Sequence, residues 1–166
     1  MPKIDTQVVE LIGRNRLVSE LLRAGLEVTV PARDRGIDLI AYADLSMDVK
    51  QFVARPIEMK AASHSSFSIN RKFKRVADLI IAYVWHLEDP SQAVTYALTW
   101  NEILEVATAM GYTRTDAWKK AGSYATTAPG RKLRDLLKLY EMTPEKWYTK
   151  IVGRRTKKQV AQSFRF

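Results

Sequence analysis

The chain has 166 residues, of which 46% are hydrophobic, so it can bury the core of one domain, and disorder of the whole chain is excluded. It contains no cysteine, which excludes disulfide bonds, a thiolate nucleophile and a cysteine-ligated zinc site. The net charge of +9 is concentrated in residues 111–166, with 14 basic and 4 acidic residues, whereas residues 1–110 hold 13 and 14. This basic segment favours a polyanionic partner, nucleic acid first, although a solvated segment that only aids solubility also accounts for it.

The first part of the chain predicts one helix followed by three strands. Apolar residues recur at helical spacing after a possible cap at Asp5 or Thr6, and Gly25 ends the pattern. Strands are then predicted over residues 26–30, 37–42 and 52–61, with turns over 32–36 and 43–48. A helix followed by closely linked strands predicts an antiparallel meander with the helix on one face.

The rest of the chain predicts two further strands and several helices. A polar loop over 63–68 and a short helix over 70–77 precede a continuous apolar run over 77–85, which is typical of a buried central strand. A strand over 93–99 and a helix from 100 or 101 to 110 follow. In the basic segment we expect helices around 115–121, 130–140 and 143–152, with a loop over 122–129. The predicted fold is α/β: a core over 1–110 with a central mixed sheet flanked by helices, and a basic, mostly helical extension over 111–166 packed on or beside it.

Three charged residues lie inside apolar strands. Residues two apart on a strand share a face, so Glu58 and Lys60 point to one side while Met59 points to the core. We expect Asp38, on the preceding strand, to join Glu58 and Lys60 in one solvent-exposed patch. Neighbouring carboxylates repel unless a cation lies between them, and oxygen ligands suit Mg²⁺ or Mn²⁺. The alternative is an ordinary cross-strand ion pair on a wet sheet face.

This order of residues resembles the PD-(D/E)XK nuclease superfamily, which has the restriction-endonuclease-like fold. The resemblance rests on Gly36-Ile37-Asp38-Leu39-Ile40 and Ile57-Glu58-Met59-Lys60, and it spans residues 8–106. It implies an αβββαβ core and a Mg²⁺-dependent (or Mn²⁺-dependent) endodeoxyribonuclease. By this resemblance Asp38, Glu58 and the carbonyl of Met59 hold the metal, and Lys60 is the catalytic lysine.

One position departs from the family pattern. Resolvase-like members often carry a glutamate on the first helix, and Arg14 stands at that position here. Glu10 lies one turn earlier on the same helix face. Either Glu10 takes the catalytic role or the site works with fewer acids.

The residues expected to contact DNA are polar or basic side chains near the second half-motif, beside the first, or in the basic segment. They are Arg35, Ser63, His64, Arg71, Lys72, Lys74, Arg75, Arg131, Lys132, Arg154, Arg155, Lys157 and Lys158. The alternative for each of these groups is that it belongs to a solvated loop or helix face and does not contact DNA.

The expected activity is DNA cleavage at particular sequences or structures, of restriction, homing or junction-resolving type. Because a duplex has two strands to cut, we expect a homodimer or tetramer. The alternatives are a DNA-binding module of the same fold without catalysis, or a structural or regulatory protein. No apolar run approaches the roughly 18 residues of a membrane span, so we expect no membrane partner and a cytoplasmic location.

Overall fold

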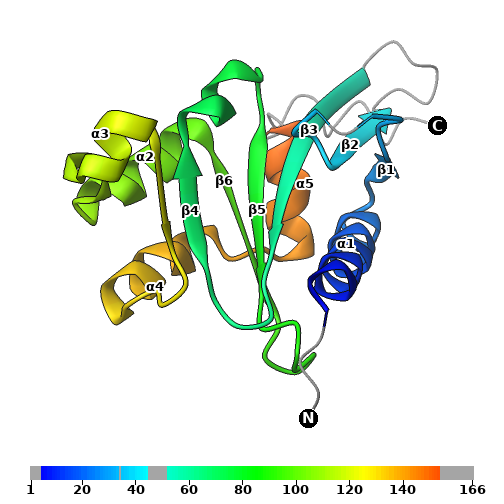
Figure 1. Cartoon of the computed structure of the whole chain (residues 1–166). Helices are drawn as coiled ribbons and strands as arrows, with labels where there is room; N and C mark the ends of the chain where they lie inside the picture. Colours follow the sequence, from blue (N-terminus) through cyan, green and yellow to red (C-terminus); the bar gives the residue numbers. More distant parts are fainter. Residues whose placement is uncertain (1–4, 34, 45–51, 154–166) are drawn as a thin grey trace, which may run out of the picture.

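The structure is a computed structural model and describes residues 5–33, 35–44 and 52–153. Its centre is a five-stranded mixed sheet with the order β1-β2-β3-β5-β6 (Figure 1). Strands β1, β2 and β3 form the predicted antiparallel meander, β3 and β5 run parallel, and β5 and β6 are antiparallel. The strands are β1 Glu27–Thr29, β2 Leu39–Asp44, β3 Phe52–Ala61, β5 Ile80–Trp85 and β6 Val94–Thr99.

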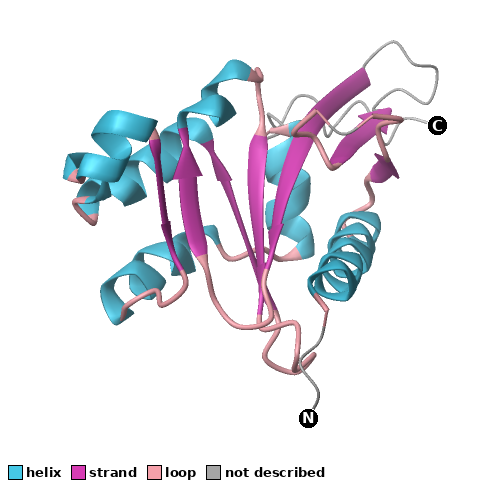
Figure 2. Ribbon diagram, in the orientation of Figure 1, coloured by secondary structure: helices cyan, strands magenta, loops and turns pink. Residues whose placement is uncertain are grey.

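Helices lie on both sides of this sheet (Figure 2), which confirms the predicted α/β class with a central mixed sheet flanked by helices. The helices are α1 Thr6–Arg23, α2 Trp100–Ala109, α3 Asp116–Ala121, α4 Arg131–Leu137 and α5 Pro144–Val152, with short 3₁₀ helices η1 Arg71–Arg75, η2 Tyr112–Arg114 and η3 Lys138–Tyr140. Among the described residues, none of these helices has the length and apolar character needed to cross a membrane.

The sheet has a hydrophobic core on each side. We call the side that carries Leu39, Ile57 and Met59 the first face; it is covered by α1 and α5. The side that carries Ile81 and Tyr83 is the second face, covered by α2, α4 and a small second sheet. Strand β5 is buried over its whole length because it contributes to both cores, which explains its continuous apolar sequence.

The central strand begins later than predicted. It starts at Ile80 rather than at residue 77, because Asp78 has a positive φ of 57° that ends the extended conformation before it. The Asp78 carboxylate lies 2.5 Å from Nη1 of Arg55 on β3. Other boundaries also differ: the predicted helix over 70–77 is the 3₁₀ helix η1, and the predicted helix over 130–140 ends at Leu137 and continues as η3.

The predicted loops over 63–68 and 122–129 are wrong in part, because they contain two strands that pair with each other. Strands β4 (Phe67–Asn70) and β7 (Ser123–Thr126) form an antiparallel two-stranded sheet on the second face. Phe67 and Ile69 are fully buried there, whereas their neighbours in sequence are polar. Strand β4 has only a short alternation of apolar and polar residues, and its partner is more than fifty residues away in sequence, so the pairing itself has no local signal.

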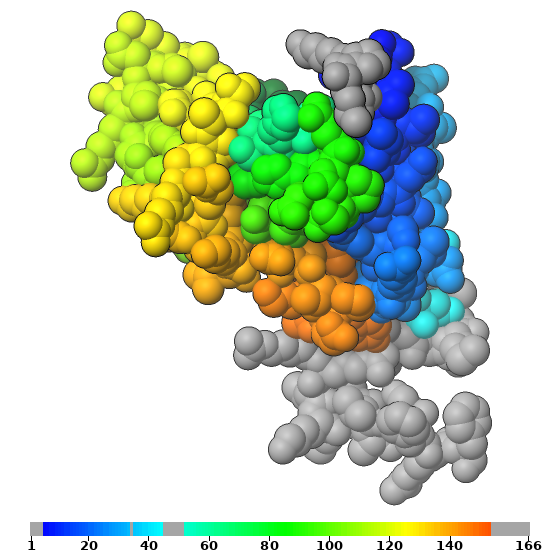
Figure 3. Space-filling model, turned by 90° about the horizontal axis from the view of Figure 1, so that it is seen from below, coloured from blue at the N-terminus to red at the C-terminus, as the bar shows by residue number. Residues whose placement is uncertain are grey.

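Helix α5 belongs to the layer on the first face, and Figure 3 shows it beside α1. A glutamate on α1 joins the two. The Trp147 indole N–H donates to Oε2 of Glu20 (3.2 Å), and the Thr95 hydroxyl on β6 donates to Oε1 (2.9 Å). Arg16 Nε lies 2.9 Å from Oε1 of the same carboxylate. Glu20 therefore ties α1, α5 and β6 together, and we call these four residues the Glu20 clamp.

Candidate functional site

Asp38 lies against the backbone of β3. The register of β2 and β3 pairs Leu39 with Ile57, so one further step places Asp38 opposite Glu58. The regular hydrogen-bond pattern between β2 and β3 ends at Leu39. Beyond it, the Asp38 N–H donates to the carbonyl of Ile57 (2.9 Å), and Asp38 Oδ2 accepts from the Met59 N–H (2.6 Å). The N–H and C=O of one strand residue leave on the same edge of the strand. The carbonyl of Met59 is therefore directed to the edge where the Asp38 carboxylate lies.

Glu58 points to the second face and is only 4% exposed. Its Oε1 lies 2.5 Å from Nζ of Lys60 and 3.2 Å from Nζ of Lys72. Both ammonium groups lie over the ring of Phe73, at 5.8 and 5.5 Å from its centroid. The expectation of a solvent-exposed patch is thus wrong for Glu58, because η1 covers this part of the sheet. The predicted sharing of one face by Glu58 and Lys60 is confirmed.

Gly36 lies beside the Glu58 carboxylate. It has a positive φ of 81°, which disfavours any residue with a side chain. A Cβ at this position would lie 3.8 Å from Oε2 of Glu58. The two half-motifs therefore meet at this point, with the first supplying a glycine turn and the second the carboxylate.

Tyr83 is part of this surrounding and was not predicted from the sequence. It is fully buried on β5, opposite Lys60 in the strand register, and its hydroxyl donates to the carbonyl of Ser68 (2.5 Å). Burial raises the pKa of the Tyr83 hydroxyl well above its usual value, and the nearby Glu58 charge raises it further. The phenol is therefore neutral and attaches β4 above the site. Its only signal in the sequence is a polar tip within an apolar strand.

Glu10 is placed on the other side of the sheet. Helix α1 packs on the first face, where a Cβ on Gly13 would lie 2.8 Å from Cβ of Ala61. Glu10 forms an ion pair with Arg14 (3.1 Å), and its side chain is 54% exposed. Because Glu58 points to the second face, the structure does not bring the Glu10 carboxylate to it.

Of the residues predicted to contact DNA, those on η1 lie nearest to Glu58. Lys72 contacts it directly, and Arg71, Lys74 and Arg75 are exposed on the same short helix. The Arg71 guanidinium lies 5.0 Å from the ring centroid of Trp118. Arg35 is exposed beside Gly36. Of these basic residues, Lys72 is the one whose charged group contacts Glu58 in the described part of the chain.

The other predicted DNA contacts lie further away. His64 follows β3, and its carbonyl accepts from the N–H of His86, which follows the end of β5. Lys72 is on η1, which precedes the start of β5. His64 and Lys72 therefore lie toward opposite ends of β5. Ser63 lies beside His64, and the imidazole of His64 is 3.7 Å from Glu88. Arg131 and Lys132 are exposed on α4. The remaining predicted contacts lie outside the described residues: Arg154, Arg155, Lys157 and Lys158.

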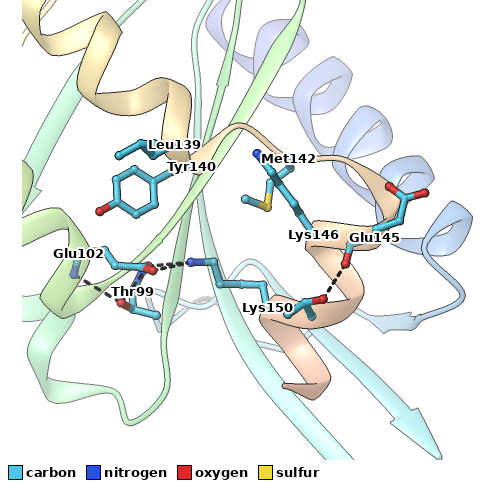
Figure 4. A pocket seen from close by; sticks show the side chains of 9 residues that line it. Thr99, Glu102, Leu139, Tyr140, Met142, Glu145, Lys146 and Lys150 are labelled. Carbon is cyan, nitrogen blue, oxygen red and sulfur yellow. Dashed lines mark hydrogen bonds and ion pairs between the residues drawn. The ribbon is translucent and has the colours of Figure 1, made fainter. Parts of the chain in front are cut away.

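A separate hollow of about 620 Å³ lies between α2, η3 and α5 (Figure 4). Two of its charged residues pair with each other: Lys150 Nζ lies 2.8 and 2.7 Å from the two carboxylate oxygens of Glu102. Burial alone would raise the pKa of Glu102, but hydrogen bonds from Lys150 and Thr99 outweigh it and hold the pKa below its usual value. The pair joins α5 to α2 and is distinct from the Asp38 and Glu58 site.

The donor set at the candidate site is two carboxylates and one backbone carbonyl. Within residues 5–33, 35–44 and 52–153, no three or more side chains of His, Cys, Asp or Glu are grouped as metal ligands. Two carboxylates with a carbonyl still suit Mg²⁺, which is commonly bound through one or two carboxylates with water and substrate completing its coordination. Comparisons of the chain with protein-family models, curated proteins and solved structures found no match.

Proposed function

We propose that the protein is a metal-dependent DNA endonuclease of the PD-(D/E)XK type, which hydrolyses phosphodiester bonds. The observation that carries the proposal is the hydrogen bond between the Asp38 carboxylate and the Met59 N–H. It brings the acid of the first half-motif against the residue between Glu58 and Lys60. The two half-motifs are twenty residues apart in sequence, and this contact brings their oxygen donors to neighbouring positions on β2 and β3.

The residues of the site fit a divalent cation. Asp38, Glu58 and the carbonyl of Met59 would hold Mg²⁺ or Mn²⁺, since all three offer oxygen donors on adjacent strands. When bound, such a cation supplies Lewis-acid polarisation of the phosphate and lowers the pKa of a coordinated water.

Lys60 and the burial of Glu58 would contribute electrostatic stabilisation at the site. The Lys60 ammonium lies 2.5 Å from the Glu58 carboxylate and is 32% exposed, so it can reach a substrate while staying beside the acid. A positive charge there stabilises the negative charge that develops on the phosphate oxygens, or orients the attacking water. The burial of Glu58 keeps bulk water away, which strengthens these electrostatic interactions.

The second candidate is a DNA-binding module of the same fold without catalysis. It is favoured by the pairing of Glu58 Oε1 with both Lys60 and Lys72, which already balances the carboxylate in the absence of a cation. In that case the basic residues of η1 would hold the DNA backbone, and the carboxylates would only organise the lysines.

Under the primary proposal the substrate is DNA, cut at particular sequences or structures by a homodimer or tetramer. The test is cleavage of supercoiled plasmid and of branched DNA in Mg²⁺, with EDTA as the metal-free control. Asp38→Asn and Lys60→Ala are each expected to slow cleavage by at least about 10³-fold. Asp116→Asn is the matched control, because its carboxylate is 81% exposed on α3 and contacts only Lys120 among the described residues.

Two outcomes would decide between the candidates. Intact DNA across all substrates and metals, with salt-dependent binding retained, would favour the non-catalytic module. Unchanged cleavage by Asp38→Asn would show that this site is not the source of the activity.

A further inference from the structure

A hollow of about 350 Å³ opens beside the two lysines that contact Glu58. We call it the β4–β7 hollow. Its walls come from β3, the small second sheet, η1 and α3, and they include Lys60, Ser68, Asn70, Lys72, Ser123 and Ala125. It therefore adjoins the proposed catalytic lysine from the second face of the sheet.

One face of the second sheet contributes four residues to the hollow, which is also lined by Ile69 and Tyr124. The register pairs Ser68 with Ala125 and Asn70 with Ser123, so these four side chains share one face. The opposite face carries Phe67, which is fully buried in the core of the second face. A buried sheet face would be filled by large apolar residues, but this face carries short side chains that leave space.

The lining offers hydrogen-bond donors and positive charge. Lys60 and Lys72 supply two ammonium groups at one end, and Ser68 and Ser123 supply hydroxyl groups from the two strands. Asn70 Oδ1 accepts from the Lys72 N–H (2.9 Å), so the amino group of that side chain is the end that can donate. No acidic side chain is among the described residues that line the hollow. These features match a phosphate with an attached polar group.

The size of the hollow excludes a base pair within a duplex. Pockets for small ligands have volumes of about 300–1,000 Å³, and 350 Å³ is at the lower end of that range. A single nucleotide can enter such a space only when it is turned out of the stack. That costs least where the nucleotide has no pairing partner.

We propose that the β4–β7 hollow binds one unpaired nucleotide of the cleaved strand, with its phosphate on Lys72 and its sugar and base on the polar face of the second sheet. This inference rests on the proposed nuclease function and specifies its substrate class as DNA with unpaired nucleotides at the cut. The β4–β7 sheet then forms one wall of the proposed active site.

The test measures binding rather than cleavage. Fluorescence anisotropy compares two duplexes of equal length with Ca²⁺ in place of Mg²⁺, one fully paired and one with a single unpaired thymidine. The wild-type protein is expected to bind the second about tenfold more tightly, which is within the range for accommodating one base. Ala125→Trp fills the hollow from an exposed strand position, and the ratio of the two affinities is expected to fall to about one.

Ala128→Trp is the matched control, because it introduces the same side chain at an exposed position nearby that does not line the hollow. It should keep the tenfold ratio. Ser68→Gln fills the hollow from β4 and serves as a second variant if Ala125→Trp does not fold, as judged by circular dichroism. It too should bring the ratio to about one.

The outcomes separate this inference from the proposed function. Equal affinity of the wild-type protein for both duplexes overturns the inference even if the protein cuts DNA, as does a ratio that survives both filling variants. A tenfold ratio lost on filling supports the subsite even if no cleavage is found, and the nuclease proposal then fails alone. Failure to bind either duplex overturns the inference.

Discussion

Two glutamates on opposite faces of the same sheet have different kinds of partners. Glu20, on the first face, accepts hydrogen bonds from a threonine hydroxyl and an indole N–H, and it has one arginine beside it. Glu58, on the second face, has two lysines on one oxygen. The first set comes from packed elements, because Trp147 is fully buried and Thr95 is 3% exposed. The two lysine ammonium groups beside Glu58 are instead at the ends of long, flexible side chains.

This difference separates a structural carboxylate from one that can change partners. The hydroxyl of Thr95 and the indole of Trp147 cannot leave Glu20 without moving β6 or α5. A lysine ammonium can leave by rotating its side chain, and that of Lys72 is 50% exposed. A buried carboxylate that is balanced in part by the exchangeable ammonium of Lys72 is suited to accept a metal ion in place of that ammonium.

The largest effect is expected for Glu58→Gln, which keeps the shape of the side chain but removes its charge. Cleavage should slow by at least about 10³-fold, because a neutral amide is a poor cation ligand. The melting temperature should stay within a few degrees of wild type, since the lysines can turn to solvent. Rates in Mg²⁺ and thermal unfolding check this. Retained cleavage would remove Glu58 from the site.

Glu20→Ala is expected to act on stability instead. It leaves the Thr95 hydroxyl and the Trp147 N–H buried without their acceptor, which costs about 2–4 kcal/mol in free energy of unfolding. Urea denaturation measures the loss, and Glu105→Ala, at an exposed position of α2, is the matched control. A loss of less than about 0.5 kcal/mol would mean that the Glu20 clamp does not hold the layers together.

A smaller effect is expected for Lys72→Gln. Cleavage should slow by about tenfold, and the slope of log affinity against log salt should fall by about one, because one phosphate contact is lost. Lys119→Gln is the control, since Lys119 is exposed on α3 and is not among the residues expected to contact DNA. If both variants lose the same activity, Lys72 contributes only to the general positive charge of the protein.

The smallest effect concerns a third glutamate, Glu102, whose lysine partner is only 16% exposed. The pKa of Glu102 is lowered in the folded protein, so its ion pair stabilises the fold above the unfolded pKa of about 4.3 and is lost as pH falls through the folded value. Lys150→Met should cost about 1–2 kcal/mol at pH 7 and less in acid.

Denaturation of this variant and of wild type at several pH values checks the dependence. Lys146→Met is the control, because its ammonium donates to the Glu141 carbonyl, which does not titrate. A loss for Lys150→Met that is the same at acid and neutral pH would contradict the role of the Glu102 charge.

Much of the secondary structure follows from the sequence because its signals are local. Asp5, one of the two caps expected for α1, accepts from the Gln7 N–H (2.8 Å), and α5 begins at Pro144, within the helix expected around 143–152. The alternation of side chains along a strand likewise placed Glu58 and Lys60 on one side. These features depend on residues within a few positions of each other.

The tertiary structure decided what surrounds those residues. Whether the side of the sheet that carries Glu58 is exposed or buried depends on where η1 packs. The residues of η1 have no local pattern that indicates this position. The pairing of β4 with β7 joins segments more than fifty residues apart, and the short alternation within β4 does not indicate which segment it pairs with. The alternation of residues along each strand shows which charged side chains share a side of the sheet. Contacts between distant segments place Trp147 and Thr95 on Glu20, two lysines on Glu58 and a polar hollow beside those lysines.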